Sequence, residues 1–284
     1  MKSILFEDVL KEKFESLSVG QKKVALYLSQ HLEEAAFLTA FHIGRKAEVS
    51  ETTVIRLTYA LGYEGYSDMQ AKIQQHLLQS TAFSKTNSKS HLISSDDTDV
   101  FSSIIKKQIH ILKKLLDHLD SELIWKTADT LIKADQVLIG GYRASYAAAC
   151  WFSHSLSMLR GNVALCSPAG DFYEKFSSLT PQSVVIVFSL PRYARESLEM
   201  AQCAKERGVK LISVTDRLLS PVGRMSDITL TTEEEAETAP NSIASAISLM
   251  ELIIQGIYIL DQKRVLAHQQ KLEELYSKKG IFIE

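Results

Sequence analysis

The sequence predicts a chain of the α + α/β class, with an all-α N-terminal domain and a C-terminal α/β/α sandwich around a five-stranded parallel sheet. In residues 4–61 the apolar residues recur at helical spacing, whereas beyond residue 134 short apolar runs alternate with helical stretches. Such runs are typical of parallel strands that helices cover on both faces. With 284 residues, 45% of them hydrophobic, the chain is long enough for one large core and one small core.

A change in composition divides the chain. Residues 80–99 are rich in Ser, Thr, Asn and Asp and have little apolar periodicity, which is typical of a linker. We therefore expect a helical domain over residues 1–79, a linker over 80–99 and a sandwich domain over 100–284.

The first part of the helical domain is expected to be a scaffold. Residues 4–30 fit one or two amphipathic helices, and residues 38–48 fit a further short helix. The predicted inner face of the first stretch consists of Leu10, Phe14, Leu17, Val24 and Leu28.

The stretch from Val49 to Tyr66 has clear signals for the start and end of a helix. Ser50 is a good N-cap because its hydroxyl accepts a hydrogen bond from a free backbone N–H. Gly62 adopts the left-handed conformation that ends a helix without a steric cost. The apolar positions fall on one side of this helix: Val54, Leu57 and Leu61.

Only residues 47–49 separate this helix from the one before it. Two short helices joined by a tight turn form a helix-turn-helix, whose second helix reads the major groove of DNA. A helical domain without a DNA partner has the same pattern, so periodicity alone leaves both interpretations open. If the pair binds DNA, the contacts are expected from Lys46, Ser50, Thr52, Thr53, Arg56 and Tyr59.

The charge of this domain argues against DNA binding by a single copy. Residues 1–80 contain nine Lys and Arg but ten Asp and Glu, whereas an independent nucleic-acid-binding domain is usually basic. The positive charge is local, because Arg45, Lys46 and Arg56 flank the proposed reading helix. We expect binding that needs a dimer and weakens steeply with salt.

The residues of this stretch also form a specific sequence motif. The string VSxTTVxR, followed by LGYxGYxxxQ, runs from Val49 to Gln70. It closely resembles the N-terminal domain of RpiR-type (RpiR/MurR) bacterial transcriptional regulators. The resemblance implies an operator-binding helix-turn-helix.

Residues 100–119 return to helical spacing, and Ser121 is a candidate cap for a second helix to Lys133. Such a pair ahead of an α/β unit serves either dimer contacts or the cover of one sheet face. Beyond it, the predicted strands are 136–139, 163–166, 184–188, 210–214 and 228–230. The predicted helices are 146–159, 171–176, 194–207, 221–225, 242–260 and 262–279.

Two loops at the carboxyl ends of predicted strands are candidate ligand sites, because open parallel sheets bind ligands at that edge. The first, GYRAS, contains Arg143 and Ser145 ahead of a helix, whose start favours an anion. It lacks the third glycine of a dinucleotide loop, and a tight structural turn is the alternative. The second, SLPRYARE, gathers Ser189 and Arg192 at another helix start, with Arg192 the better candidate for a bidentate anion contact.

Together the two loops resemble the sugar isomerase (SIS) domain, the ligand-sensing half of RpiR-type regulators, and the similarity continues through SVTDRLLSPVGRMSDITL. The resemblance implies that Ser145 and Ser189 hold a sugar phosphate. Arg143 and Pro191 depart from the usual GxGxS and SxSGxT patterns, so an anionic group is expected but its sugar part is not fixed. Glu237, in an acidic run before the last apolar helix, matches the region of a catalytic glutamate in SIS isomerases and is a further candidate ligand contact.

The remaining features of the sequence concern localisation and metal binding. No run of about 18 apolar residues predicts a membrane span, and the N-terminus lacks the apolar core of a signal peptide, so a cytoplasmic protein is expected. Cys150, Cys166 and Cys203 lack the spacing of a zinc site, and all three are expected to be buried. No metal and no cofactor are predicted.

The sequence therefore predicts a transcriptional regulator, not an enzyme. Its partners are expected to be double-stranded operator DNA, a small anionic effector such as a sugar phosphate, and further copies of the chain in a homodimer or homotetramer. One alternative is an SIS-type sugar-phosphate isomerase with a helical appendage. Another is a DNA-binding structural protein without a ligand.

Overall fold

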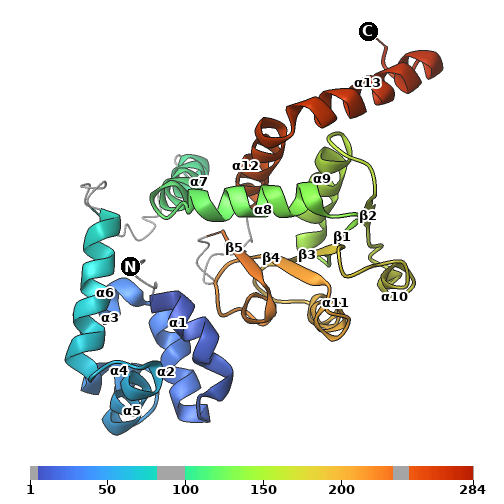
Figure 1. Cartoon of the computed structure of the whole chain (residues 1–284). Coiled ribbons are helices and arrows are strands. Elements are labelled where there is room, and N and C mark those ends of the chain that lie inside the picture. Colours follow the sequence, from blue (N-terminus) through green and yellow to red (C-terminus); the bar gives the residue numbers. More distant parts are fainter. Residues whose placement is uncertain (1–5, 82–99, 233–242, 284) are drawn as a thin grey trace. The chain divides into compact units, whose positions relative to one another are not determined.

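The computed structural model describes residues 6–81, 100–232 and 243–283 (Figure 1). The chain divides into two compact units. The first consists of residues 1–100 with 217–219, and the second of residues 101–216 with 220–284.

The N-terminal unit is entirely helical in its described residues. Its elements are α1 (Phe6–Lys13), a 3₁₀ turn (Phe14–Ser16), α2 (Val19–Gln30), α3 (Leu32–Ala35), α4 (Ala40–Lys46), α5 (Glu51–Leu61) and α6 (Tyr66–Thr81). The predicted inner face is confirmed, because its five residues are all buried in one cluster: Leu10, Phe14, Leu17, Val24 and Leu28.

Helix α6, which the apolar pattern did not predict, explains the end of the LGYxGYxxxQ string. Gly62 has φ +93° and ends α5 in the left-handed conformation, as predicted. Tyr66 Oη and Gln70 Nε2 both donate to the Leu38 carbonyl oxygen, each at 2.7 Å. The Tyr and Gln of the motif thereby fix α6 to the loop that leads into α4.

The C-terminal unit contains a five-stranded parallel sheet in the order β2-β1-β3-β4-β5. Its strands are β1 (Val137–Gly141), β2 (Val163–Leu165), β3 (Val184–Ser189), β4 (Lys210–Thr215) and β5 (Ile228–Thr231). The helices are α7 (Val100–Asp117), α8 (Ser121–Lys133), α9 (Ser145–Ser157), α10 (Phe172–Phe176), α11 (Arg195–Glu206), α12 (Ala244–Leu260) and α13 (Gln262–Lys279), with a 3₁₀ turn at Gly223–Met225. The predicted fold class is confirmed.

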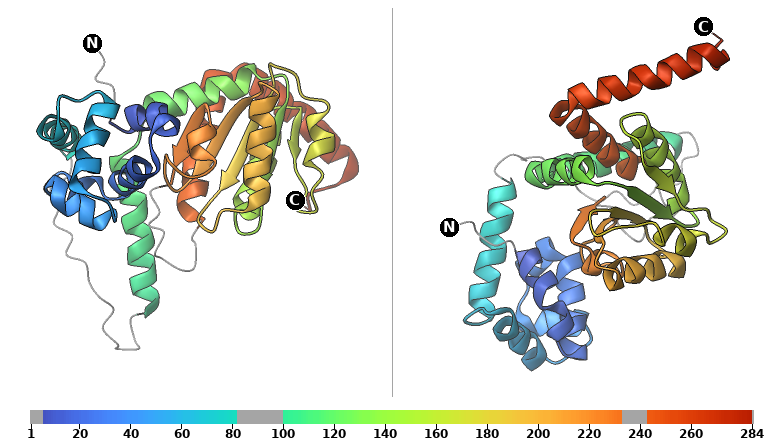
Figure 2. Two further views of the ribbon diagram at one scale, coloured as in Figure 1. Left: turned by 90° about the horizontal axis from the view of Figure 1, so that it is seen from below. Right: turned by 45° about the vertical axis from the view of Figure 1, so that its right-hand side comes forward.

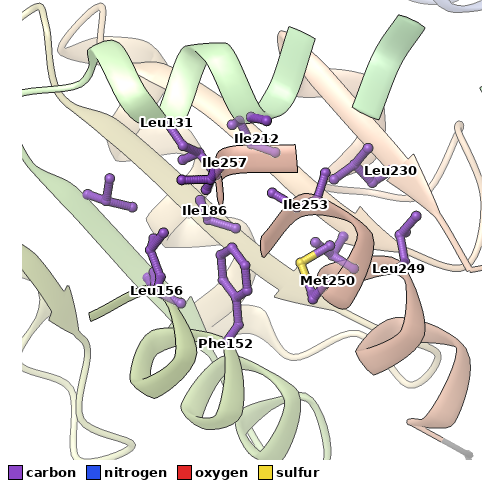
Figure 3. Close-up of a cluster of buried hydrophobic side chains, with 14 of the residues drawn as sticks. Leu131, Phe152, Leu156, Ile186, Ile212, Leu230, Leu249, Met250, Ile253 and Ile257 are labelled. Atoms are coloured by element: carbon purple, nitrogen blue, oxygen red, sulfur yellow. The ribbon is translucent and has the colours of Figure 1, made fainter. Parts of the chain in front are cut away.

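Helices cover both faces of the sheet. On one face α8, α9 and α12 share a core with alternate strand residues, among them Phe152, Ile186, Met250 and Ile253 (Figure 3). On the other face α10 and α11 pack against the intervening positions, such as Val185 and Val187. Two expectations needed correction. Helix α8 is capped by Asp120, not Ser121, because the Asp120 carboxylate accepts from Leu123 N at 3.0 Å. Of the three cysteines expected to be buried, only Cys166 is, since Cys150 lies exposed on the outer side of α9 and Cys203 is half-buried.

Strands β1, β3 and β4 continue past their predicted ends. The pairs Gly141↔Phe188 and Ser189↔Thr215 extend the parallel ladder to the last residue of each strand. From β1 the chain passes to β2 on one side of β1, and then crosses to β3 on the other side. The carboxyl ends of β1 and β3 therefore form the topological switch point, where open α/β sheets bind ligands.

Two glycines at the end of β1 let α9 and α11 press onto the strand. A Cβ on Gly140 would lie 2.2 Å from Met200 Sδ on α11, and a Cβ on Gly141 would lie 2.7 Å from the Ser145 carbonyl oxygen. Neither glycine has a positive φ. Glycine is needed at both positions because a side chain would not fit. The change in chain direction occurs at the residues that follow.

Within residues 6–81, 100–232 and 243–283, no single helix is long and apolar enough to span a bilayer. Only α12 and α13 taken together reach that length and apolarity, with a 103° bend between them.

The glycine packing gives a testable difference between two neighbouring substitutions. Gly141→Ala is expected to lower the free energy of unfolding by about 2 kcal/mol, because the new methyl meets fixed backbone. Gly140→Ala should cost less than about 1 kcal/mol, since the flexible Met200 thioether can move away. Urea denaturation followed by circular dichroism measures both, and equal losses would contradict this account.

Candidate functional site

The turn between α4 and α5 is tight because Gly44 has no side chain. Val49 N donates to the Gly44 carbonyl oxygen at 2.8 Å, and a Cβ on Gly44 would lie 3.0 Å from the Val49 carbonyl oxygen. Glu48 turns the chain with φ +55°, a left-handed conformation that is uncommon outside glycine. These contacts fix the angle at which α5 leaves α4.

The start of α5 is held by a side-chain cap. Ser50 Oγ accepts from Thr53 N at 3.3 Å, and the two hydroxyl oxygens lie 2.9 Å apart. From α2, Gln21 Nε2 donates to the Arg56 carbonyl oxygen at 3.2 Å. Two of the predicted DNA-contacting residues, Ser50 and Thr53, thus also position the helix.

The outer face of α5 presents the other predicted residues to solvent. Thr52, Arg56 and Tyr59 are exposed, and Tyr59 retains 60% of its accessible surface. The opposite face is buried, as predicted, through Val54 and Leu57. The helix therefore shows a polar and aromatic surface of the kind that reads base edges.

Lys46, in the last turn of α4, is already paired. Its Nζ lies 2.5 Å from Glu34 Oε1, and Tyr27 Oη donates to the same carboxylate at 3.0 Å. The hydrogen bonds from Lys46 and Tyr27 hold the pKa of Glu34 below its ordinary value, and burial together with Glu34 raises the pKa of Tyr27 to about 12. An exposed pair of this kind is weak enough for a phosphate to compete for the ammonium group.

In the C-terminal unit, one hydrogen bond joins the two candidate ligand loops. Ser145, only 6% exposed, accepts through Oγ from Leu190 N at 3.1 Å. Ser145 begins α9 after β1, and Leu190 directly follows β3. The loops that the sequence singled out separately are therefore neighbours at the switch point.

Arg143 and Arg192 occupy equivalent places in these loops. Both are exposed, and both have a positive φ, +54° for Arg143 and +68° for Arg192. Left-handed backbone costs an L-residue roughly 1–2 kcal/mol, so neither arginine is favoured by local sterics. A backbone conformation of this kind directs attention to the function of the side chain.

Ser189 ends β3 with a buried hydroxyl. The residue is 1% exposed, and its Oγ has no hydrogen-bond partner among the described residues. Its carbonyl oxygen accepts from Thr215 Oγ1 at 2.7 Å. Tyr193 Oη donates to the Asp216 carboxylate at 2.8 Å, which ties the second loop to the end of β4. Tyr193 and Asp216 were not predicted as site residues, and only their position beside strand ends could have indicated them.

The helices that leave these two loops start without side-chain caps. The N-cap residues are Ala144 for α9 and Ala194 for α11, and neither forms a side-chain cap hydrogen bond. Among the other described helices, α2, α4, α5 and α8 are capped by side chains of Ser18, Thr39, Ser50 and Asp120. Helices α3, α10, α12 and α13 also start without a side-chain cap. At the start of α9, Ser145 N and Tyr146 N donate to the carbonyl oxygens of Tyr142 and Arg143, each at 3.1 Å, and the N–H groups of the helix start that remain are a candidate site for an anion.

The arginines of the described residues differ in whether their side chains have a polar partner. Arg160, Arg195, Arg207 and Arg264 all donate to carbonyl or carboxylate oxygens. No hydrogen bond or ion pair of the side chain involves Arg45, Arg56, Arg143 or Arg192. Two of these four flank or lie on the reading helix, and the other two lie in the ligand loops.

Two further predictions concern Glu237 as a ligand contact and the absence of a metal site. Glu237 lies outside the described residues. Within the described ranges, no group of three or more His, Cys, Asp and Glu side chains gathers in a way that would hold a metal ion.

Comparison with known proteins agrees with this architecture. Residues 4–80 match the family model of the helix-turn-helix domain of the rpiR family, and residues 130–255 match that of the SIS domain. The HTH-type transcriptional regulator HexR of Pseudomonas aeruginosa is 23% identical over 282 residues, which cover 96% of this chain and 95% of HexR. An uncharacterised HTH-type transcriptional regulator of Caldanaerobacter subterraneus is 26% identical over 284 residues, with 96% and 97% coverage.

Two solved structures share the fold. Vibrio vulnificus NanR, complexed with ManNAc-6P, superposes with a TM-score of 0.59 at 18% identity and covers 98% of this chain and 99% of its own. The sugar isomerase domain of an RpiR transcription factor from Sphaerobacter thermophilus has a TM-score of 0.59 at 24% identity, covering 62% of this chain and 99% of that domain.

A helix-turn-helix domain followed by an SIS domain defines a class of transcriptional regulators. The chain belongs to the RpiR family of that class. Its relatives of similar length are named as regulators and not as enzymes.

Proposed function

We propose that this regulator binds operator DNA through α5 and senses a small anionic metabolite, a phosphosugar or related carbohydrate derivative, in its SIS domain. The observation that carries the sensing function is the joined pair of loops at the switch point. Each loop brings an arginine without a polar partner to an uncapped helix start, and both features favour a bound anion. The complex of NanR with ManNAc-6P supports a phosphosugar as the class of ligand.

The DNA contacts are assigned to the exposed face of α5 and its flanks. Arg56 and Thr52 are proposed to reach base edges, with Tyr59 beside them. Ser50 and Lys46 are proposed to contact the phosphate backbone near the start of the helix. A single reading helix contacts only one half-site, so the functional form is proposed to contain at least two copies.

Helix α7 is proposed to form the contact between copies. It extends away from the sandwich layers (Figure 2) and leaves Phe101, Ile105, Ile109 and Leu116 between 46% and 83% exposed along one stripe. At its C-terminal end α7 lines a groove of about 710 Å³ together with Trp151 and other residues of α9 and α12. An amphipathic helix beside an apolar groove on the same chain lets two copies bury each other's apolar surface.

Sensing and DNA binding are coupled only if the ligand prefers one arrangement of the reading helices over another. The domain division proposed here is residues 1–79 for DNA and 100–284 for the ligand and the dimer. The segment between them is then the covalent route through which the SIS domains set the spacing of the two reading helices.

Replacing Arg56 tests the DNA assignment. Arg56→Ala is expected to weaken binding to an operator selected from genomic DNA by about 1–3 kcal/mol, because a bidentate contact to a guanine edge is lost. Fluorescence anisotropy at one fixed salt concentration measures this change. Arg264→Ala, which removes an arginine from α13, is the control. Unchanged affinity in Arg56→Ala would remove this residue from the interface.

Replacing Arg192 tests the sensor assignment. In the wild type, a phosphosugar effector should change operator affinity, and Arg192→Ala should abolish this response because the ligand loses its charged partner. Operator affinity without ligand should remain at the wild-type value. If the variant loses operator binding but still binds the ligand, as measured by calorimetry, the assignment of Arg192 to the ligand site is wrong.

A charge on α7 tests the dimer contact. Ile105→Glu should convert the oligomer to monomer at micromolar concentration, because a carboxylate would be buried in the apolar contact without a partner. Light scattering after size exclusion measures the mass. Lys107→Glu, on the polar side of the same helix, should leave the mass unchanged. An oligomer in Ile105→Glu would refute this interface.

A further inference from the structure

The two ligand loops are built alike, and each contains its own set of anion-binding features. Arg143 immediately precedes Ala144, the uncapped start of α9, and Arg192 lies two residues before Ala194, the uncapped start of α11. A helix start with free N–H groups binds one anionic group well, and an adjacent guanidinium strengthens that contact. The structure thus contains two candidate anion positions, one in each loop.

The bond between the loops limits how far apart the two positions can lie. Arg143 lies two residues before Ser145 and Arg192 lies two residues after Leu190, at the two ends of the 3.1 Å hydrogen bond. Two residues of extended chain reach at most about 7 Å. The backbone of each arginine therefore lies within about 7 Å of one end of the bond, so a ligand placed over the bond has both arginines beside it.

Two carboxylates near the loops are engaged by other side chains, and a third, Glu196, lies in the first turn of α11. Asp216 accepts from Tyr193 Oη, and Glu199 pairs with Arg195 at 3.0 Å. An arginine is charged at every physiological pH, and no described carboxylate is bonded to Arg143 or Arg192. One phosphate placed beside one arginine would leave the other arginine without an ionic partner among the described residues.

A third group independently indicates a polar ligand between the two positions. The Ser189 hydroxyl is 99% buried and has no partner among the described residues, and the next residue, Leu190, donates the hydrogen bond that joins the loops. A buried hydroxyl without a partner costs free energy, which a ligand hydroxyl or phosphate oxygen would recover.

We infer that the effector has two separated anionic groups, one held by Arg143 at the start of α9 and one by Arg192 at the start of α11. This inference rests on the proposed sensing function and narrows its ligand class. The class consists of sugar bisphosphates and phosphorylated sugar acids, as distinct from sugar monophosphates.

Matched pairs of probes test this inference on the full-length protein by isothermal titration calorimetry. Fructose 1,6-bisphosphate is compared with fructose 6-phosphate, and 6-phosphogluconate with glucose 6-phosphate. In at least one pair the second anionic group should tighten binding by about tenfold to a hundredfold, as expected of one added charge-assisted contact. Preference in the first pair identifies a second phosphate, and preference in the second pair identifies a carboxylate.

Two variants then assign the anionic groups to the arginines. Arg143→Gln and Arg192→Gln should each weaken binding of the preferred probe at least about tenfold, and the two factors should multiply in the double variant because the contacts are independent. Each single variant should also erase the preference for the second anionic group. Arg264→Gln is the control and should bind as the wild type does, and thermal unfolding checks that every variant is folded.

The possible failures are distinguishable. If monophosphates bind as tightly as their partners with two anionic groups, or if the two arginine factors do not multiply, the two-anion inference is overturned and phosphosugar sensing stands. If none of the four probes binds, the phosphosugar assignment itself is overturned, and the inference with it.

Discussion

The close approach of α9 and α11 to the end of β1 is the constraint on which the C-terminal unit depends. Gly140 and Gly141 supply the missing volume on the two faces of the strand. Because both helices lie against the same strand end, their starts meet at the same edge of the sheet. The Ser145–Leu190 hydrogen bond can form only in that arrangement. The candidate ligand site is therefore a consequence of how tightly one strand is packed.

Much of the fold could be predicted because its signals are local. The strands are continuous runs of β-branched and apolar residues, and α5 has its cap at Ser50 and its end at Gly62. Helix α6 was missed for a physical reason. Its buried apolar residues, Met69 and Ile73, stand beside Gln70 and Gln74, which donate to the carbonyl oxygens of Leu38 and Ala36, so the apolar stripe is narrow.

The site could be predicted only in part. The sequence placed Arg143, Ser145, Ser189 and Arg192 in loops at strand ends. It did not reveal that Ser145 bonds to the other loop, because this contact joins residues 45 apart in the chain. The glycines of the first loop suggested a sharp turn, yet the left-handed residue is Arg143. A conformation of this kind in a non-glycine residue is set by tertiary structure and leaves no local trace.

The left-handed arginines have a consequence for how the specificity of this regulator can change over generations. At both positions glycine would adopt the backbone without steric cost, and this relief of roughly 1–2 kcal/mol exceeds the roughly 0.4–1 kcal/mol that the greater freedom of glycine in the unfolded chain costs. Drift at Arg143 or Arg192 therefore leads toward a more stable protein that has lost its guanidinium. Under the proposed sensing function, ligand choice can therefore change at these two sites without harm to the fold, and selection on the ligand response opposes the loss of either arginine.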